Sequence, residues 1–310
     1  MPSSPNMLWL GFAGVILVMF ILDLGVFNRK SHEIRLREAL AWTIVWVSLA
    51  LGFNAWIYYT MGPTKALEFL TGYIIEESLS VDNLFVFIMI FSYFRVPKAL
   101  QPKILKWGIL GALVMRGIFI IAGIELIERF HWMIYLFGAL LIYTGIKMAF
   151  GHDEKIEPEK NPLVRLARRI MPVTRRMQGD RFFIKKCGKR AATPLFLTLL
   201  VVESSDLIFA VDSIPAVLAV TRDPFIVYTS NVFAIMGLRS LYYLLAGFME
   251  LFVHLKIGVS FILAYVGVKM LLVDIFHIPI YFSLGMILGV LTISIITSVT
   301  IGKKHRRHPH

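Results

Sequence analysis

Nine long apolar stretches, separated by shorter polar segments, set the pattern of this chain. They span approximately residues 7–27, 40–60, 68–93, 105–126, 132–150, 193–219, 225–248, 257–275 and 279–301. Each approaches the roughly 20 residues that an α-helix needs to cross a bilayer core. The alternating pattern of outer-membrane β-strands is absent from the sequence. The pattern therefore predicts an all-α, polytopic membrane protein with about nine transmembrane helices.

Composition supports a membrane protein. Hydrophobic residues make up 57% of the 310 positions, and the mean hydropathy is +0.73, whereas soluble domains are about 45–50% apolar. The stretch at 7–27 lacks a basic region before it and a small-residue cleavage site after it. We therefore expect a retained helix there and not a signal peptide.

Basic residues are divided unequally between alternate loops. One side carries 25 of the 32 Lys and Arg residues, and the other carries only Lys65, Arg129 and Arg222. By the positive-inside rule, the basic side faces the cytoplasm. We therefore expect a multi-pass protein of the cell inner membrane, with its amino terminus outside and its carboxyl terminus in the cytoplasm. The net charge of +12 then reflects topology and contact with anionic lipid, and a nucleic-acid partner is not expected.

Two halves of the chain repeat the same ordered motifs. In each half an acidic motif is followed by an arginine and then by a Gly-aliphatic-Lys-Met segment. The matched positions are Asp82 with Asp212, Arg116 with Arg239, and Gly145–Met148 with Gly267–Met270. Each unit has three stretches, an odd number, so the second must be inverted relative to the first. This predicts the inverted repeat of many secondary transporters, which bind substrate near the midplane between the repeats.

The repeat divides the chain into five parts within one transmembrane domain. Two peripheral helices (1–65) precede the first repeat (66–150), a basic cytoplasmic connector (151–190), the second repeat (191–276), and a last helix with a cytoplasmic tail (277–310). Basic and apolar residues alternate between 165 and 176, which is typical of a short interfacial helix. The preferred interpretation of this segment is nevertheless a plain connector.

Carboxylates gather in the first stretch of each repeat. Glu76, Glu77 and Asp82 lie in 68–93, and Glu203, Asp206 and Asp212 lie in 193–219. Because a carboxylate at the centre of a membrane helix costs about 2.5–3.5 kcal/mol on insertion scales, we expect all six to face the bundle interior.

Two alignments of the acidic motifs remain open. One sets Glu76 opposite Asp206, and the other sets Glu77 opposite Glu203. Pro215 removes a backbone hydrogen bond to Val211, so the sequence predicts that the helix kinks or opens beside Asp212.

Charge and ligand chemistry point to a hard cation. The six carboxylates exceed their expected balancing charges, Arg116, Arg239, Lys147 and Lys269, by two, which suits one divalent ion or two protons. Oxygen ligands without neighbouring His or Cys favour Mg²⁺, Ca²⁺ or Mn²⁺. The strongest ligand candidates are Asp82, Asp206 and Asp212, followed by Glu76, Glu77, Glu203 and Asn83. The alternative is a salt-bridge scaffold that carries no cargo.

The acidic motifs also resemble a known family. Glu77-Ser-Leu-Ser-Val-Asp-Asn-Leu-Phe-Val and Glu203-Ser-Ser-Asp-Leu-Ile-Phe-Ala-Val-Asp-Ser-Ile-Pro-Ala are similar to the two signatures of the TerC family, and the resemblance continues through residues 229–242. Within that family the chain is most similar to the Alx subgroup. The resemblance implies association with Mn²⁺ export and tellurite resistance, or a membrane-bound redox modulator.

Together with the carboxylates, the resemblance favours a transporter that exports Mn²⁺. Export in exchange for protons is the coupling that the sequence suggests. It predicts no enzymatic activity and no permanently bound cofactor. An accessory membrane protein of tellurite resistance, or a redox modulator without transport activity, remains an alternative. The sequence gives little support to the redox alternative, because Cys187 is the only cysteine and cannot form an intramolecular disulfide.

Overall fold

The computed structural model describes most of the chain. The described ranges are 5–27, 36–150, 161–174, 177–186, 189–246, 255–276 and 278–306. The helices are α1 (Pro5–Phe27), α2 (Leu36–Met61), α3 (Pro63–Tyr93), α4 (Gln101–Arg129), α5 (Met133–Phe150), α6 (Pro162–Ile170), α7 (Pro194–Leu218), α8 (Pro224–Ala246), α9 (Leu255–Leu271) and α10 (Ile280–Arg306).

All nine predicted stretches coincide with helices, which confirms the all-α membrane class. Within the described residues, five helical segments are long and apolar enough to cross a membrane by length and composition. They are α2, α4 with the 3₁₀ turn before it (Lys98–Leu100), α5, α7 and the part of α10 up to Ser298. The expectation of nine crossings stays a prediction.

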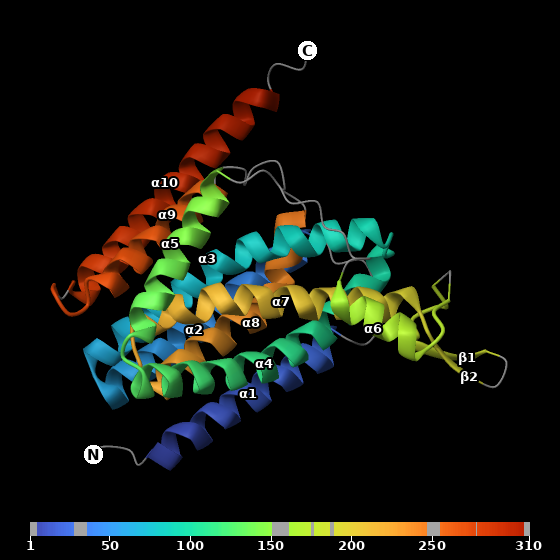
Figure 1. Ribbon diagram of the computed structural model, residues 1–310, viewed down its shortest axis with the longest axis horizontal. Helices are drawn as coiled ribbons and strands as arrows, with labels where there is room; N and C mark the ends of the chain where they lie inside the picture. Colours follow the sequence, from blue (N-terminus) through green and yellow to red (C-terminus); the bar gives the residue numbers. More distant parts are fainter. Residues whose placement is uncertain are drawn as a thin grey trace.

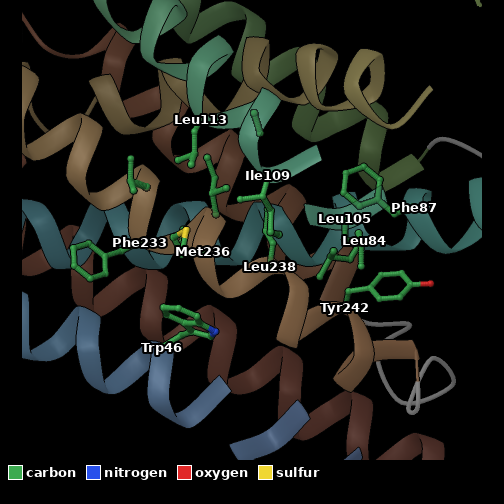
Figure 2. Packing of buried hydrophobic residues seen from close by; sticks show 14 of the residues in the cluster. Trp46, Leu84, Phe87, Leu105, Ile109, Leu113, Phe233, Met236, Leu238 and Tyr242 are labelled. Carbon is green, nitrogen blue, oxygen red and sulfur yellow. The ribbon is translucent and has the colours of Figure 1, made fainter. Parts of the chain in front are cut away.

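The helices form two groups that differ in direction (Figure 1). One group contains α3, α4, α7 and α8, with α1 and α2 beside them, and the other contains the inclined helices α5, α9 and α10. Helix α8 lies at the centre of the first group and is buried along most of its length. Figure 2 shows its residues Phe233, Met236 and Leu238 packed between Trp46 of α2 and side chains of α4 such as Ile109.

The contact between α5 and α9 has the symmetry of an inverted repeat. A Cβ atom added at Gly138 would lie 2.9 Å from the Gly267 carbonyl oxygen, and one at Gly145 would lie 2.7 Å from the Ser260 carbonyl oxygen. The pairing is antiparallel, since the partner number falls as the other rises. Gly145 and Gly267 are matched positions of the two motifs. Gly145 contacts Ser260, seven positions before Gly267, and Gly267 contacts Gly138, seven positions before Gly145. A two-fold axis would exchange the two contacts, as the predicted inversion requires.

Helix α7 corrects one expectation. It continues without interruption through Pro215 to Leu218, and the Ala219 N–H donates to the Pro215 carbonyl oxygen. The predicted opening beside Asp212 is therefore wrong. Because Pro215 lies in the last turn, the missing N–H costs one hydrogen bond and leaves the helix before it intact.

The connector is more structured than the preferred interpretation held. Its helix α6 is capped by Asn161, whose Oδ1 accepts from the Leu163 N–H at 2.9 Å. An antiparallel hairpin follows, with β1 (Phe183–Lys186) paired to β2 (Lys189–Ala192). A side-chain cap and strand pairing satisfy the backbone locally, and the position of this connector at the cytoplasmic face stays a prediction. Cys187 and most of the residues between α5 and α6 lie outside the described ranges.

Candidate functional site

A buried ion triad joins the two repeats. Arg116 of α4 lies between Glu76 of α3 and Asp206 of α7, and the three residues are 1%, 1% and 3% exposed. The Arg116 Nη1 donates to both Glu76 oxygens, at 3.0 Å for Oε2. Its Nη2 donates to Asp206 Oδ1 at 3.0 Å, and its Nε donates to Oδ2 at 3.3 Å. The guanidinium thus uses both edges of its planar fork, the geometry that makes Arg–carboxylate pairs strong.

Two further carboxylates face glycines of the opposite repeat. A Cβ atom at Gly111 of α4 would overlap the carboxylate of Glu203, and a Cβ atom at Gly237 of α8 would lie 3.6 Å from Glu77 Oε1. Gly111 therefore leaves room for the Glu203 carboxylate, whereas Glu77 lies at ordinary contact distance from position 237. Both alignments of the acidic motifs stay predictions.

One of these carboxylates has an oxygen without a partner. Glu77 Oε2 is buried and has no hydrogen-bond partner among the described residues. Burying a charged oxygen without compensation is costly, so this oxygen requires a proton or a cation.

A small cavity adjoins the triad. It has a volume of about 20 Å³ and is bordered by Glu203, Asp206 and Arg239 together with apolar side chains such as Phe87. This is enough for roughly one water molecule, which needs a cavity of at least about 10–15 Å³. The cavity therefore has room for one small ligand beside two carboxylates.

The remaining candidates lie elsewhere. Asp212 accepts a hydrogen bond from Thr144 of α5 at 2.9 Å, and the charge of Lys147 also acts on it. Lys269 donates to Ser283 of α10 at 3.1 Å. Asn83 is buried, whereas Asp82 belongs to α3 with its side chain outside the described part.

The predicted ligands are therefore only partly brought together. Glu76 and Asp206 bind Arg116, Glu203 borders a cavity with Arg239, and Asp212 faces α5. No group of three acidic, His or Cys side chains with metal-binding geometry occurs in the part of the chain that the structure describes. The physical reason is that Arg116 stands between Glu76 and Asp206. A site shared by all seven candidates stays a prediction.

A second cavity, which the sequence did not predict, lies at the end of the bundle where α3 begins and α7 ends. It measures about 730 Å³ and is lined by the start of α3, the α7–α8 loop and the α9–α10 region. Lys65 binds Glu68 at 2.8 Å and Asp223 at 3.1 Å across its edge, and the Thr221 hydroxyl donates to Glu68 at 2.5 Å. Glu68, an acid at the start of an apolar stretch, was the signal available in the sequence.

Comparison with known proteins identifies the family. The model of the integral membrane protein TerC family matches residues 61–306. An uncharacterized membrane protein of Myxococcus xanthus, STKORF319, is 51% identical, with 96% of this chain and 93% of the relative covered. The putative membrane-bound redox modulator Alx of Escherichia coli (strain K12) is 48% identical, with 96% of each chain covered. An uncharacterized membrane protein of Rickettsia bellii is 36% identical, with 94% of this chain and 97% of the relative covered. No solved structure matches this chain. The chain belongs to the TerC family of integral membrane proteins.

Proposed function

We propose that this chain exports a divalent metal cation, with Mn²⁺ as the first candidate, in exchange for protons. One observation carries the proposal: Glu77 Oε2 is buried within the bundle without a hydrogen-bond partner among the described residues. A scaffold that only held helices together would be expected to pair its buried charges, because an unpaired one is strongly destabilising. An oxygen that exchanges a proton for a cation has a reason to lack a permanent partner.

The surroundings of Glu77 supply the rest of the chemistry. Glu203 borders the cavity of about 20 Å³ beside Asp206, and carboxylate oxygens suit Mn²⁺. Arg116 holds Glu76 and Asp206 in the present arrangement. If either carboxylate left the guanidinium, it would become available as a further ligand. When the ion departs, the close acids would take up protons, since like charges in one site do not all ionise.

The larger cavity supports a route to the outer face. In the orientation expected from the basic loops, the ends of α3, α7 and α9 that surround it face outward. Its volume of about 730 Å³ is ample for a hydrated ion. We therefore propose that ions leave through this cavity after passing the carboxylates.

Reconstituted protein gives the direct test. Proteoliposomes containing a Mn²⁺-sensitive dye inside should show Mn²⁺ entry and a coupled pH change, and Glu77→Gln should abolish both. Glu125→Gln, the same chemical change at a residue with a side chain 54% exposed, should leave both intact. Absence of flux from the unaltered chain would refute the function, whereas flux at the full rate in Glu77→Gln would refute only the role of this residue.

A double-substitution cycle tests the predicted shared site. Asp82→Asn and Asp212→Asn should each abolish Mn²⁺ tolerance in cells while the protein still accumulates in the membrane. If both residues bind one ion, the double variant should lose little more affinity than either single variant, because residues of one site are not additive. Additive losses would indicate two separate sites.

The names of the Alx relatives suggest redox modulation as a second candidate. Such a role through a protein thiol would depend on Cys187, the only cysteine of the chain. Cys187→Ser should then abolish any effect of the chain on the cellular thiol balance. Export of Mn²⁺ should survive the same substitution, so the two functions give opposite results.

A further inference from the structure

Helix α6 divides its surface into three faces. Val164 and Ala167, which are 1% and 8% exposed, form the face that is buried in the protein. At about 100° per residue, a second face carries the apolar residues Leu163, Leu166 and Ile170. These are 39%, 53% and 68% exposed. Arg165 and Arg169 are exposed on the third face.

The placement of α6 follows from contacts at its two ends. Asn161, its cap, donates from Nδ2 to the Ser204 hydroxyl of α7 at 2.6 Å. Beyond its other end, Val173 pairs with Ala192, just before α7 begins. Helix α6 therefore runs alongside the first turns of α7, next to the hairpin at the same end of the bundle (Figure 1).

Neighbouring aromatic residues mark this end as a membrane boundary. Trp107 of α4 is 48% exposed and meets the ring of Phe182 at 6.5 Å between centroids. Phe183 is 44% exposed and packs on Phe196 at 4.5 Å. Trp side chains such as that of Trp107 are enriched at the membrane–water interface. The end of α6 beside the hairpin therefore lies near the level at which lipid headgroups begin.

We propose that α6 binds the anionic phospholipid headgroups of the cytoplasmic leaflet. Arg165 and Arg169 match phosphate in charge and in the geometry of their donors. The adjoining exposed face of Leu163, Leu166 and Ile170 fits the boundary between headgroups and acyl chains, as in other amphipathic helices at membrane surfaces. Because Asn161 both caps α6 and binds Ser204, lipid bound to α6 also holds it against the segment that carries Glu203. The inference does not depend on export.

Accessibility of the apolar face tests this binding. Cys187→Ser removes the only cysteine, and Leu166→Cys then introduces a single thiol on α6. The full chain is placed in nanodiscs of phosphatidylcholine, alone or mixed with phosphatidylglycerol, and labelled with a water-soluble maleimide. We expect labelling to be about threefold or more slower in the anionic discs. Ile170→Cys provides a second reporter if Leu166→Cys folds poorly.

Charge-matched variants isolate the arginines. Adding Arg165→Gln and Arg169→Gln should remove the difference between the two kinds of disc. Adding Arg37→Gln and Lys98→Gln instead also removes two exposed charges that are expected on the cytoplasmic side. This second double variant should keep the difference in labelling between the two kinds of disc. Equal labelling in both discs, or equal effects of the two double variants, would overturn the proposal. Protection by inorganic phosphate in phosphatidylcholine discs would also overturn it, since the occupant would then be a free anion.

Discussion

Removing Arg116 tests the buried triad most directly. Arg116→Leu would leave Glu76 and Asp206, 1% and 3% exposed, without their shared cation. Breaking a buried ion pair in this way typically costs about 3–5 kcal/mol, and here one guanidinium serves two carboxylates. We expect the free energy of unfolding of the purified protein to fall by about that amount. Arg129→Leu is the surface control: its side chain is 70% exposed, so the loss should stay below about 1 kcal/mol.

A triple variant separates the structural cost from the functional one. Glu76→Gln, Arg116→Leu and Asp206→Asn together remove all three charges, and replacing a complete buried ion network is often nearly neutral. Denaturant titration in detergent micelles, monitored by tryptophan fluorescence, should therefore show most of the stability restored. Mn²⁺ flux in proteoliposomes should be lost in the triple variant, because it lacks two of the proposed ligand carboxylates. A loss below about 1 kcal/mol for Arg116→Leu alone, or a triple variant as unstable as the single one, would refute this account of the triad.

Three further predictions concern the helix packing, the hairpin and the topology. Gly267→Ala places a Cβ atom 2.6 Å from the Gly138 carbonyl oxygen and should destabilise the protein by about 1–3 kcal/mol in the same titration. Gly285→Ala, with nothing within 4 Å, should have little effect. A hydrogen bond from Lys103 lowers the pKa of Asp180, so this contact stabilises hairpin docking above the ordinary Asp value of about 3.9. The protection factors of the hairpin amides, which are corrected for the intrinsic exchange rate at each pH, should fall only as the pH falls through the lower pKa of the folded state. A reporter fused after Asp153 should read cytoplasmic and one between α7 and α8 external; the reverse would overturn the assigned orientation.

The fold was largely predictable because membrane insertion imposes a strong pattern. Each predicted apolar stretch became a helix, and the matched motifs Gly145–Met148 and Gly267–Met270 both lie on helices that meet in a close antiparallel contact. Local hydrogen bonds in the connector were harder to anticipate. The Asn161 cap and the pairing of β1 with β2 depend on a few polar groups and leave no periodic signal in the sequence.

The sequence predicted which carboxylates are buried, but it did not predict which arginine each of them would contact. Burial of carboxylates in α3 and α7 follows from their insertion cost, and the structure brings Glu76 and Asp206 to one arginine. Sequence spacing gave no means to distinguish Arg116 from Arg239 as their partner, because both follow an acidic motif in the same order. The contact of Asp212 with Thr144 depends on the inclination of α5, which no residue pattern encodes.

The two ends of the bundle are not equivalent, although the repeats share the same ordered motifs. Arg116 of the first repeat binds one carboxylate from each repeat, and the cavity of about 730 Å³ at one end contrasts with about 20 Å³ beside Glu203. In transporters built from inverted repeats, the two halves adopt unlike conformations and exchange them. The exchange would enlarge the cavity beside Glu203 and close the one bordered by Lys65. Export by alternating access, as we propose it for this chain, then requires that the carboxylates open to one side of the membrane at a time.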